Sequence, residues 1–589
     1  MQIQERVQAL RRKMAERGLE AYIVPSSDPH QSEYLCDYYK TREYISGFSG
    51  SAGIAVITRT KAGLWTDGRY FLQAGEELKD GPFQLYRLGI DIPLLDFLKK
   101  EVSPFGKIGF DGYCMSLENY TEFAKGLGQR MLVADVDYIG EIWEDRPSLP
   151  KAKAFFLDEK YSGKSVEDKL EVLRYMMKTR QIDYHFISSP EDICYLLNIR
   201  GRDVKNTPVI LSYALISQEK AMLFVDGKKL EKDVIQGLEE ADVTIFEYEG
   251  IQEKLEDIEG QKIVYLQPSR TNIFLFQKIK DNVKIQRGLN LTSLMKAIKN
   301  ETEIENLKEA YTKDGVALVK FFNWVETGAK TGNINEKFAV ERLNQFRDED
   351  EDFLEDSFDA IIGYAENAAI IHYNPSSQPR SKSIENRGLL LVDSGGQYYQ
   401  GTTDITRTYA MGALSYEEQQ DYTLVLKSHI AGMRAVFLEG TTGNYIDSLC
   451  KQPIWQAKKD YNHGTGHGVG YLLSVHEGPQ TFSKRDGGVE IAPGMVTSIE
   501  PGLYIANSHG IRLESIVLCV KDEKNVFGQF LSFEPLTWLP LDTRPVLRSL
   551  LDQEEIDWLN EYNKTSYEKL APYLEDMDLE YLEKITQEI

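Results

Sequence analysis

The chain has 589 residues, of which 42% are hydrophobic and 27% are charged, so it is long enough for roughly three or four domains with substantial cores. Its 92 acidic residues outnumber its 68 lysines and arginines, which gives a formal net charge of −24. A surface this negative repels phosphate backbones and anionic lipid headgroups, which argues against nucleic-acid and membrane partners. The same charge favours cations and substrates with a positively charged end.

The cysteines and the N-terminus indicate the compartment. The five cysteines are odd in number, widely spaced and without a C-x-x-C pair, which disfavours a disulfide framework and a structural zinc knuckle. The first residues are charged where a secretory signal needs an apolar stretch. No apolar run approaches the ~20 residues that span a bilayer. These features predict a cytoplasmic globular protein.

Two stretches of the N-terminal half resemble each other, which indicates an internal duplication. Residues 7–24 and 170–187 align without a gap, and each has the pattern of an amphipathic helix that leads into a short apolar strand. Further along, the strand-like segments before Asp67-Gly68 and Asp226-Gly227 repeat a hairpin pattern in the same order. We therefore predict two related α/β domains.

The domain boundaries follow from changes in the pattern along the chain. We place the first domain at residues 1–146 and the second at residues 147–296, with a proline-containing linker between them. The third domain spans residues 297–589 and opens at Asn300 with acidic residues in the first turn of a helix. Strands and glycine-rich turns follow, and an acidic helical extension is expected from about residue 530. This order predicts α/β domains followed by an α+β domain.

Histidines gather in one part of the third domain. Three of the eight histidines, His463, His467 and His476, lie in or close to the glycine-dense run HGTGHGVG. Alternating glycines disfavour a helix, so the spacing is not that of an H-E-x-x-H zinc protease. A strand or tight loop is predicted instead, in which glycine allows a close approach of the backbone.

Four carboxylates interrupt apolar, strand-like segments of the same domain. Asp393 ends the run LLLV, Asp404 lies on the returning stretch, and Glu500 and Glu514 lie in VTSIEPG and GIRLESIV. An inward carboxylate is costly unless a positive charge neutralises it. Together with His467, these oxygens form a ligand set that suits two divalent ions such as Mn²⁺ better than a structural zinc site.

Each of these residues also has an ordinary explanation when it is taken singly. An Asp before Gly-Gly is usually a turn residue, and a Glu in a strand usually faces water. His509 is expected to cap a loop, whereas His30, His185 and His429 lack companions and are expected at the surface or at the edge of the core. The ordered set with its spacings is what favours a metal centre.

This ordered set resembles the dinuclear metal site of the pita-bread peptidases, and the surrounding motifs are similar to those of the aminopeptidase P family. The motifs are LVDSGGQY, GTTDITRT, HGTGHGVG, HEGP, SIEPGLY and GIRLES, preceded in the N-terminal part by SSDPHQSEY, SGFSGSAG and WTDGRYFLQA. The resemblance covers nearly the whole chain. It implies two creatinase-type α/β domains, a pita-bread catalytic domain with a C-terminal helical extension, and a cytosolic homodimer.

The resemblance also implies the ligands and the reaction. The ligands would be Asp393, Asp404, His467, Glu500 and Glu514. They would hold two divalent metal ions, with Mn²⁺ as the first candidate and Co²⁺ and Zn²⁺ as alternatives. A metal-bridging hydroxide would hydrolyse the N-terminal Xaa-Pro bond of peptides with proline at the second position. Glu500 would also carry the proton of that reaction.

Five further residues receive roles from the same resemblance. His476 would face the developing oxyanion. His463 and His372 would hold substrate or shape the proline pocket. Arg512 would brace a ligand carboxylate, and Tyr504 is a weaker candidate for the same role.

Two alternatives stay open on the sequence. A prolidase-type Xaa-Pro dipeptidase would use the same metal-binding site and would have to recognise the free carboxylate of the dipeptide. The chain length, the doubled N-terminal domains and the C-terminal extension argue against it. A non-catalytic binding protein of the same fold would have lost metal ligands, whereas all five are present in this sequence.

Overall fold

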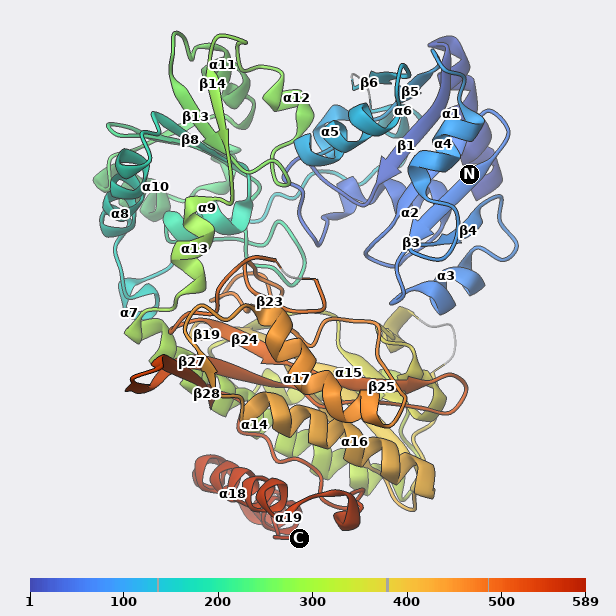
Figure 1. Cartoon of the computed structure of the whole chain (residues 1–589), viewed down its shortest axis with the longest axis vertical. Coiled ribbons are helices and arrows are strands. Elements are labelled where there is room, and N and C mark those ends of the chain that lie inside the picture. Colours follow the sequence, from blue (N-terminus) through green and yellow to red (C-terminus); the bar gives the residue numbers. More distant parts are fainter. Residues whose placement is uncertain (135–136, 378–380, 486) are drawn as a thin grey trace. The chain divides into compact units, whose positions relative to one another are not determined.

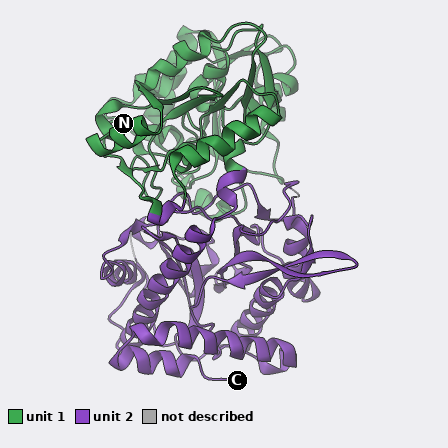
Figure 2. Ribbon diagram, turned by 90° about the vertical axis from the view of Figure 1, so that its left-hand side faces the viewer, with its two compact units in different colours: residues 1–159, 164–293 green, residues 160–163, 294–589 purple. Residues whose placement is uncertain are grey.

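The chain divides into two compact units, coloured separately in Figure 2. The computed structural model describes residues 1–134, 137–377, 381–485 and 487–589. The first unit comprises residues 1–159 and 164–293, and the second comprises residues 160–163 and 294–589. The two predicted N-terminal domains lie in the first unit except for residues 160–163 and 294–296. Because this unit holds both of them, the boundary at residue 146 stays a prediction.

The first unit is built from two six-stranded sheets of the same design. The first has the strand order β4-β3-β2-β1-β5-β6, and the second has the order β12-β11-β10-β8-β13-β14. The central strands β1 (Leu19–Pro25) and β8 (Tyr184–Ile187) each follow a helix, α1 (Ile3–Glu16) and α8 (Val166–Thr179). Each central strand pairs antiparallel with the first strand of the hairpin that follows it, β2 or β10. On its other side it pairs parallel with β5 or β13.

Corresponding strands pair in the same sense throughout the two sheets. The shared order and pairing confirm the duplication inferred from residues 7–24 and 170–187. The remaining strands are β2 (Ile54–Thr58), β3 (Ala62–Thr66), β4 (Gln84–Arg87), β5 (Lys107–Gly109), β6 (Met131–Val133), β10 (Tyr213–Ser217), β11 (Ala221–Phe224), β12 (Val243–Phe246), β13 (Ile263–Leu266) and β14 (Lys284–Arg287).

The two halves of this unit join through equivalent positions. Ser116 caps α5 (Leu117–Gly126), and Asn272 caps α12 (Ile273–Phe276). The two capping residues form an antiparallel bridge, in which the Leu117 N–H donates to the Thr271 carbonyl (2.8 Å) and the Ile273 N–H donates to the Met115 carbonyl (2.9 Å). The N-termini of α5 and α12 therefore pack against each other where the two duplicated modules meet.

The expectation that three histidines lie at the surface or the edge of the core is wrong. His30, His185 and His429 are all fully buried. The His30 ring joins the two halves of the first unit, since Nδ1 lies 2.8 Å from the Ser188 carbonyl and Nε2 lies 2.8 Å from the Tyr248 hydroxyl. These partners come from the second half of the duplication, which a search for neighbours along the chain does not reveal.

The second unit opens with the long helix α14 (Glu301–Ala329). Asn300 caps it, and Glu303 completes a capping box, as the acidic start of the domain predicts. The buried residues of α14 recur at helical spacing, which explains why the helix lies against the strands. A second helix, α15 (Glu336–Arg347), follows α14.

Short sheets form the centre of the second unit. Two of them carry most of the predicted site: β16-β17-β20 and β21-β28-β27-β24. Helices α16 (Tyr416–Met433) and α17 (Gly443–Gln456) pack on each other and enclose a large core with β24 and β27. The strands are β16 (Ile361–Tyr364), β17 (Leu389–Ser394), β20 (Ile405–Ala410), β21 (Phe437–Leu438), β24 (Val496–Ile499), β27 (Ser515–Asn525) and β28 (Gly528–Pro535).

The C-terminal extension consists of α18 (Gln553–Leu570) and α19 (Asp576–Ile585), which lie along α14 (Figure 1). Arg407, buried on β20, connects the extension to the site. Its guanidinium donates to the Leu539 and Pro540 carbonyls and the Tyr562 hydroxyl on one side, and to the Glu514 carbonyl on the other. Through Arg407, the extension therefore helps to hold the backbone of Glu514, a predicted metal ligand.

Replacing Arg407 with Met is expected to lower the free energy of unfolding of the second unit by about 2–3 kcal/mol, because several buried carbonyls lose a charged donor. Urea unfolding followed by tryptophan fluorescence measures this change. Arg548→Met is the control, since Arg548 is exposed. Equal stability of the two variants would contradict the conclusion that Arg407 connects the C-terminal extension to the segment of Glu514.

Candidate metal centre

The five predicted ligands come together at the ends of strands in the second unit. Asp393 is the last residue but one of β17, and Asp404 directly precedes β20. His467 lies in β22 (Gly466–His467), Glu500 follows β24, and Glu514 joins β26 (His509–Arg512) to β27. Because these strands are neighbours in space, residues more than one hundred positions apart share one site.

Three overlapping groups of side chains could each hold a metal ion. They are Asp393 with Asp404 and Glu514, His467 with Glu500 and Glu514, and Asp404 with His467 and His476. Within each group one ligand atom per residue lies within 4.8 Å of the others. Asp404, His467 and Glu514 each belong to two groups, so the three groups overlap through these residues.

Glycine allows the strands to approach each other closely at the site. A Cβ on Gly466 would lie 1.9 Å from the Ser498 carbonyl, and a Cβ on Gly395 would lie 1.9 Å from the Thr403 carbonyl. Both distances are far inside van der Waals contact, so a side chain at either position would push apart the strands that carry ligands. This confirms the predicted close approach of the HGTGHGVG segment.

The carboxylates of the site disfavour each other's charged form. Burial, followed by the charges of Asp404, Glu500 and Asp393, raises the pKa of Glu514 well above its usual value. Burial also raises the pKa of Glu500 to about 7, with His467 and Arg512 acting in the opposite direction. Burial raises the pKa of Asp393, which Arg512 counters. Such a cluster is relieved by bound cations.

The donor set fits divalent metal ions. One oxygen of Asp393 accepts a hydrogen bond from Arg512, whereas Oδ1 is buried and has no hydrogen-bond partner among the described residues. An unpartnered carboxylate oxygen beside three other acids and an imidazole is the environment of hard or borderline cations. Asp393, Asp404 and Glu514 are buried, while Glu500, His467 and His476 are partly exposed, so the open side of the site is the side with the histidines.

Arg512 contacts one carboxylate of the site and also contacts Tyr504. The Arg512 guanidinium donates to Asp393, to the Tyr504 hydroxyl (2.7 Å) and to the Ile371 carbonyl (3.4 Å). The same hydroxyl lies 2.8 Å from Nε2 of His463. Tyr504 therefore links the Arg512 brace to one of the predicted substrate-holding histidines.

The remaining predicted residues are near this network. The His476 ring meets the His467 ring edge-on, with the centroids 4.4 Å apart. His372 directly follows Ile371, whose carbonyl Arg512 binds, and is half-buried. His509, expected to cap a loop, lies instead in β26 with Nε2 3.2 Å from Asp421.

Sequence reasoning missed a buried ion pair behind the ligands. Arg347 on α15 donates to both carboxylate oxygens of Asp314 on α14, at 2.8 and 3.2 Å, and both side chains are fully buried. Arg347 also donates to the Ser394 hydroxyl (3.0 Å), and the Thr403 hydroxyl donates to Asp314 (2.6 Å). These two partners are the chain neighbours of Asp393 and Asp404. The available signal was a charged residue, Asp314, within the apolar stripe of a predicted helix.

A second missed cluster lies next to His476. The Glu477 carboxylate pairs with Lys296 at 3.0 Å and with Lys299 at 3.5 Å, and all three side chains are buried. Burial lowers the pKa of Lys299, and Glu477 acts against that effect. The pairing anchors the loop that carries His476.

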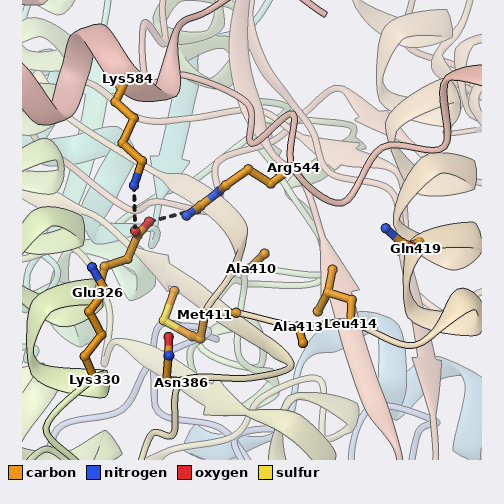
Figure 3. A pocket seen from close by; sticks show the side chains of 11 residues that line it. Glu326, Lys330, Asn386, Ala410, Met411, Ala413, Leu414, Gln419, Arg544 and Lys584 are labelled. Carbon is orange, nitrogen blue, oxygen red and sulfur yellow. Dashed lines mark ion pairs between the residues drawn. The ribbon is translucent and has the colours of Figure 1, made fainter.

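A surface pocket of about 340 Å³ lies elsewhere in the second unit, at the C-terminal extension (Figure 3). Glu326 on α14 is its centre, with Arg544 at 2.8 Å and Lys584 at 3.9 Å. None of the predicted site residues lines this pocket. Its ion pairs fasten the extension to α14.

Replacing Arg347 with Met is expected to cost about 3–5 kcal/mol of unfolding free energy, because it leaves Asp314 buried and unpaired. The double variant Arg347→Met/Asp314→Leu is expected to recover a large part of that loss. Both values come from denaturant unfolding of the metal-free protein. A single variant as stable as the wild type would show that the pair does not support the ligand strands.

Four family descriptions match the chain. Metallopeptidase family M24 matches residues 305–521, and the C-terminal region of that family matches residues 529–589. The creatinase/prolidase N-terminal domain matches twice, at residues 6–146 and 145–303. The double match agrees with the repeated sheet order of the first unit.

Individual relatives are similar over nearly the full length. A probable Xaa-Pro aminopeptidase P of Laccaria bicolor is 39% identical over 97% of this chain and 91% of its own, and aminopeptidase P2 of Arabidopsis thaliana is 36% identical over 97% and 86%. The crystal structure of an X-prolyl aminopeptidase of Caenorhabditis elegans, described as a cytosolic enzyme with a di-nuclear active site, matches with a TM-score of 0.95 at 32% identity over 100% of both chains. This chain therefore belongs to metallopeptidase family M24, as a hydrolase of the Xaa-Pro aminopeptidase P group with two creatinase-type N-terminal domains.

Proposed function

We propose that this protein is a dinuclear metal-dependent aminopeptidase that removes the first residue of peptides with proline at the second position. The observation that carries the proposal is the convergence of four carboxylates and His467 into three overlapping ligand groups. The names of the relatives and the di-nuclear active site described for the C. elegans enzyme support it.

Asp393, Asp404, His467, Glu500 and Glu514 would hold the two ions. Mn²⁺ is the first candidate because most of the donors are carboxylate oxygens, with Co²⁺ and Zn²⁺ as alternatives. When bound, the ions would supply Lewis acidity that polarises the scissile carbonyl and lowers the pKa of a bound water toward ~7, which would provide the hydroxide nucleophile.

Glu500 is suited to move the proton of this reaction. Its carboxylate would take a proton from the attacking water and return it to the proline nitrogen that leaves. A ligand on the partly exposed side of the site can reach both water and substrate.

The histidines and Arg512 would position the substrate and the ligands. His476, whose ring contacts that of His467 on the open side, would donate to the oxyanion that forms on the carbonyl. His463, held through Tyr504, and His372 would hold the peptide or shape the proline slot. Arg512 would keep Asp393 charged and oriented.

An Xaa-Pro bond requires a site of this kind because its nitrogen lacks an N–H and its ring fixes φ. A site that holds the free amino end and offers an apolar slot to the ring selects such bonds. The acidic surface would favour a protonated amine on approach.

We place the enzyme in the cytoplasm, without nucleic-acid or membrane partners, and expect a homodimer. The description of the C. elegans enzyme as cytosolic supports the location. The homodimer is inferred from the family resemblance alone. Among the described residues, no helix combines the length and the hydropathy needed to cross a bilayer.

Asp404→Ala is expected to remove bound metal and to lower kcat/KM on Arg-Pro-Pro by about 10²–10³-fold or more, since Asp404 belongs to two ligand groups. Elemental analysis and a peptide cleavage assay measure both effects. Asp522→Ala, at an exposed acid on β27, is the control and is expected to behave as wild type. Full activity of Asp404→Ala would refute the ligand assignment.

The dipeptidase alternative is decided by substrate length. The wild-type protein is expected to release arginine from Arg-Pro-Pro and to leave Gly-Pro intact. Chromatography of the products after incubation with Mn²⁺ distinguishes the two. Preferential cleavage of Gly-Pro would make the protein a prolidase.

The metal-free protein is expected to lose stability as pH rises from about 4.5 to about 7. Over this range the folded Glu500, with its pKa raised from 4.5 to about 7, holds a proton that the unfolded chain has lost, so each rise in pH favours unfolding. Thermal unfolding of the EDTA-treated protein at several pH values measures this, and Glu500→Gln is expected to show a shallower slope. Added Mn²⁺ is expected to remove most of the loss. Identical slopes for wild type and Glu500→Gln would contradict the titration of Glu500.

A further inference from the structure

Tyr311 lies inside the second unit with a hydroxyl that the fold does not use. The residue is on α14, and its side chain is fully buried. The hydroxyl makes no hydrogen bond within the part of the chain that the structure describes. A buried hydroxyl without a partner is costly, and the large majority of buried hydroxyls have one. Its presence here therefore requires an explanation.

The face of α14 that carries Tyr311 is directed at the segment that ends in Asp404. One turn before Tyr311, Leu307 lies against Gly401, where a Cβ would come within 2.6 Å of Leu307 Cδ2. One turn after it, Asp314 accepts the hydrogen bond from Thr403. Positions 307, 311 and 314 share one helix face, so Tyr311 faces the same segment between these two contacts.

The charges around the phenol identify what it faces. Burial raises the pKa of Tyr311 far above its ordinary value, and the carboxylates of Asp404 and Glu514 are the next largest causes, ahead of Asp314. The Asp404 backbone N–H approaches the phenol oxygen and acts in the opposite direction, without reaching a standard hydrogen bond. Tyr311 is therefore a neutral donor beside the two acids that are each shared between ligand groups.

We propose that Tyr311 is a positioning residue that donates its O–H to the Asp404 carboxylate when the metal ions are bound, and so fixes the orientation of that ligand. The inference rests on the proposed metal centre. A carboxylate has about four lone-pair sites, so Asp404 can bind ions and still accept a phenol hydrogen bond. Partners of this kind orient metal ligands, and their loss typically lowers metal affinity by about 10–100-fold.

Tyr311→Phe in the full-length protein tests the proposal, because it removes the hydroxyl and keeps the ring. Competition with a chromophoric chelator gives the Mn²⁺ dissociation constants, and the variant is expected to bind Mn²⁺ about 10-fold or more weakly than wild type. Thermal unfolding of the metal-free variant is expected at or above the wild-type temperature, since no hydrogen bond is lost there. A purely structural tyrosine would lower the unfolding temperature and leave the metal affinity unchanged.

Tyr422→Phe is the matched control. Tyr422 is equally buried, and its hydroxyl donates to the Asp542 carbonyl at 2.8 Å. This variant is expected to lower the unfolding temperature and to keep the wild-type Mn²⁺ affinity. Mn²⁺ affinity of Tyr311→Phe within twofold of wild type would overturn the proposal, as would a metal-free unfolding temperature lowered as much as in the control. Neither readout uses peptide cleavage. If the wild-type protein binds Mn²⁺ and does not cleave Xaa-Pro peptides, the proposed substrate is refuted. The two variants still test the role of Tyr311 in that case.

Discussion

Four carboxylates that share one site repel one another, and the second unit is arranged around this repulsion. Asp393, Asp404 and Glu514 are buried, so water does not screen them. The raised pKa values of Asp393, Glu500 and Glu514 express the cost of this arrangement before any cation binds. Two divalent ions at the proposed site would relieve this repulsion, since four positive charges would balance the four carboxylates.

The supports of the site are cations and hydrogen bonds placed behind the ligands. Arg512 binds Asp393 directly, and Arg347 reaches the neighbours of Asp393 and Asp404 through Ser394 and Asp314. Arg407 holds the carbonyl of Glu514 and ties it to the C-terminal extension. The segments that carry Asp393, Asp404 and Glu514 are therefore held by α14, α15 and the C-terminal extension.

The first unit shows how a duplicated sequence yields a repeated structure. Similar helix-strand patterns produce sheets with the same order and the same pairing, and the helix caps Ser116 and Asn272 meet at the join. The patterns were visible in the sequence because they are local: helical spacing, apolar strands and Asp-Gly turns. The contacts at the join come from side chains far apart along the chain, so the burial of His30 was not foreseen.

Local patterns along the chain were enough to predict the duplication and the start of α14 at Asn300. They also identified the five residues that converge in the folded chain: Asp393, Asp404, His467, Glu500 and Glu514. Each of these leaves a signal in its own segment, such as a capping box, an acid within an apolar strand, or a histidine among glycines. Three contacts emerged only from the folded chain: Arg347 pairs with Asp314, Tyr504 joins Arg512 to His463, and Tyr311 lies beside Asp404. These contacts depend on which helix packs against which strand. The free energy that selects this packing is distributed over all core residues, so no single position in the sequence predicts it.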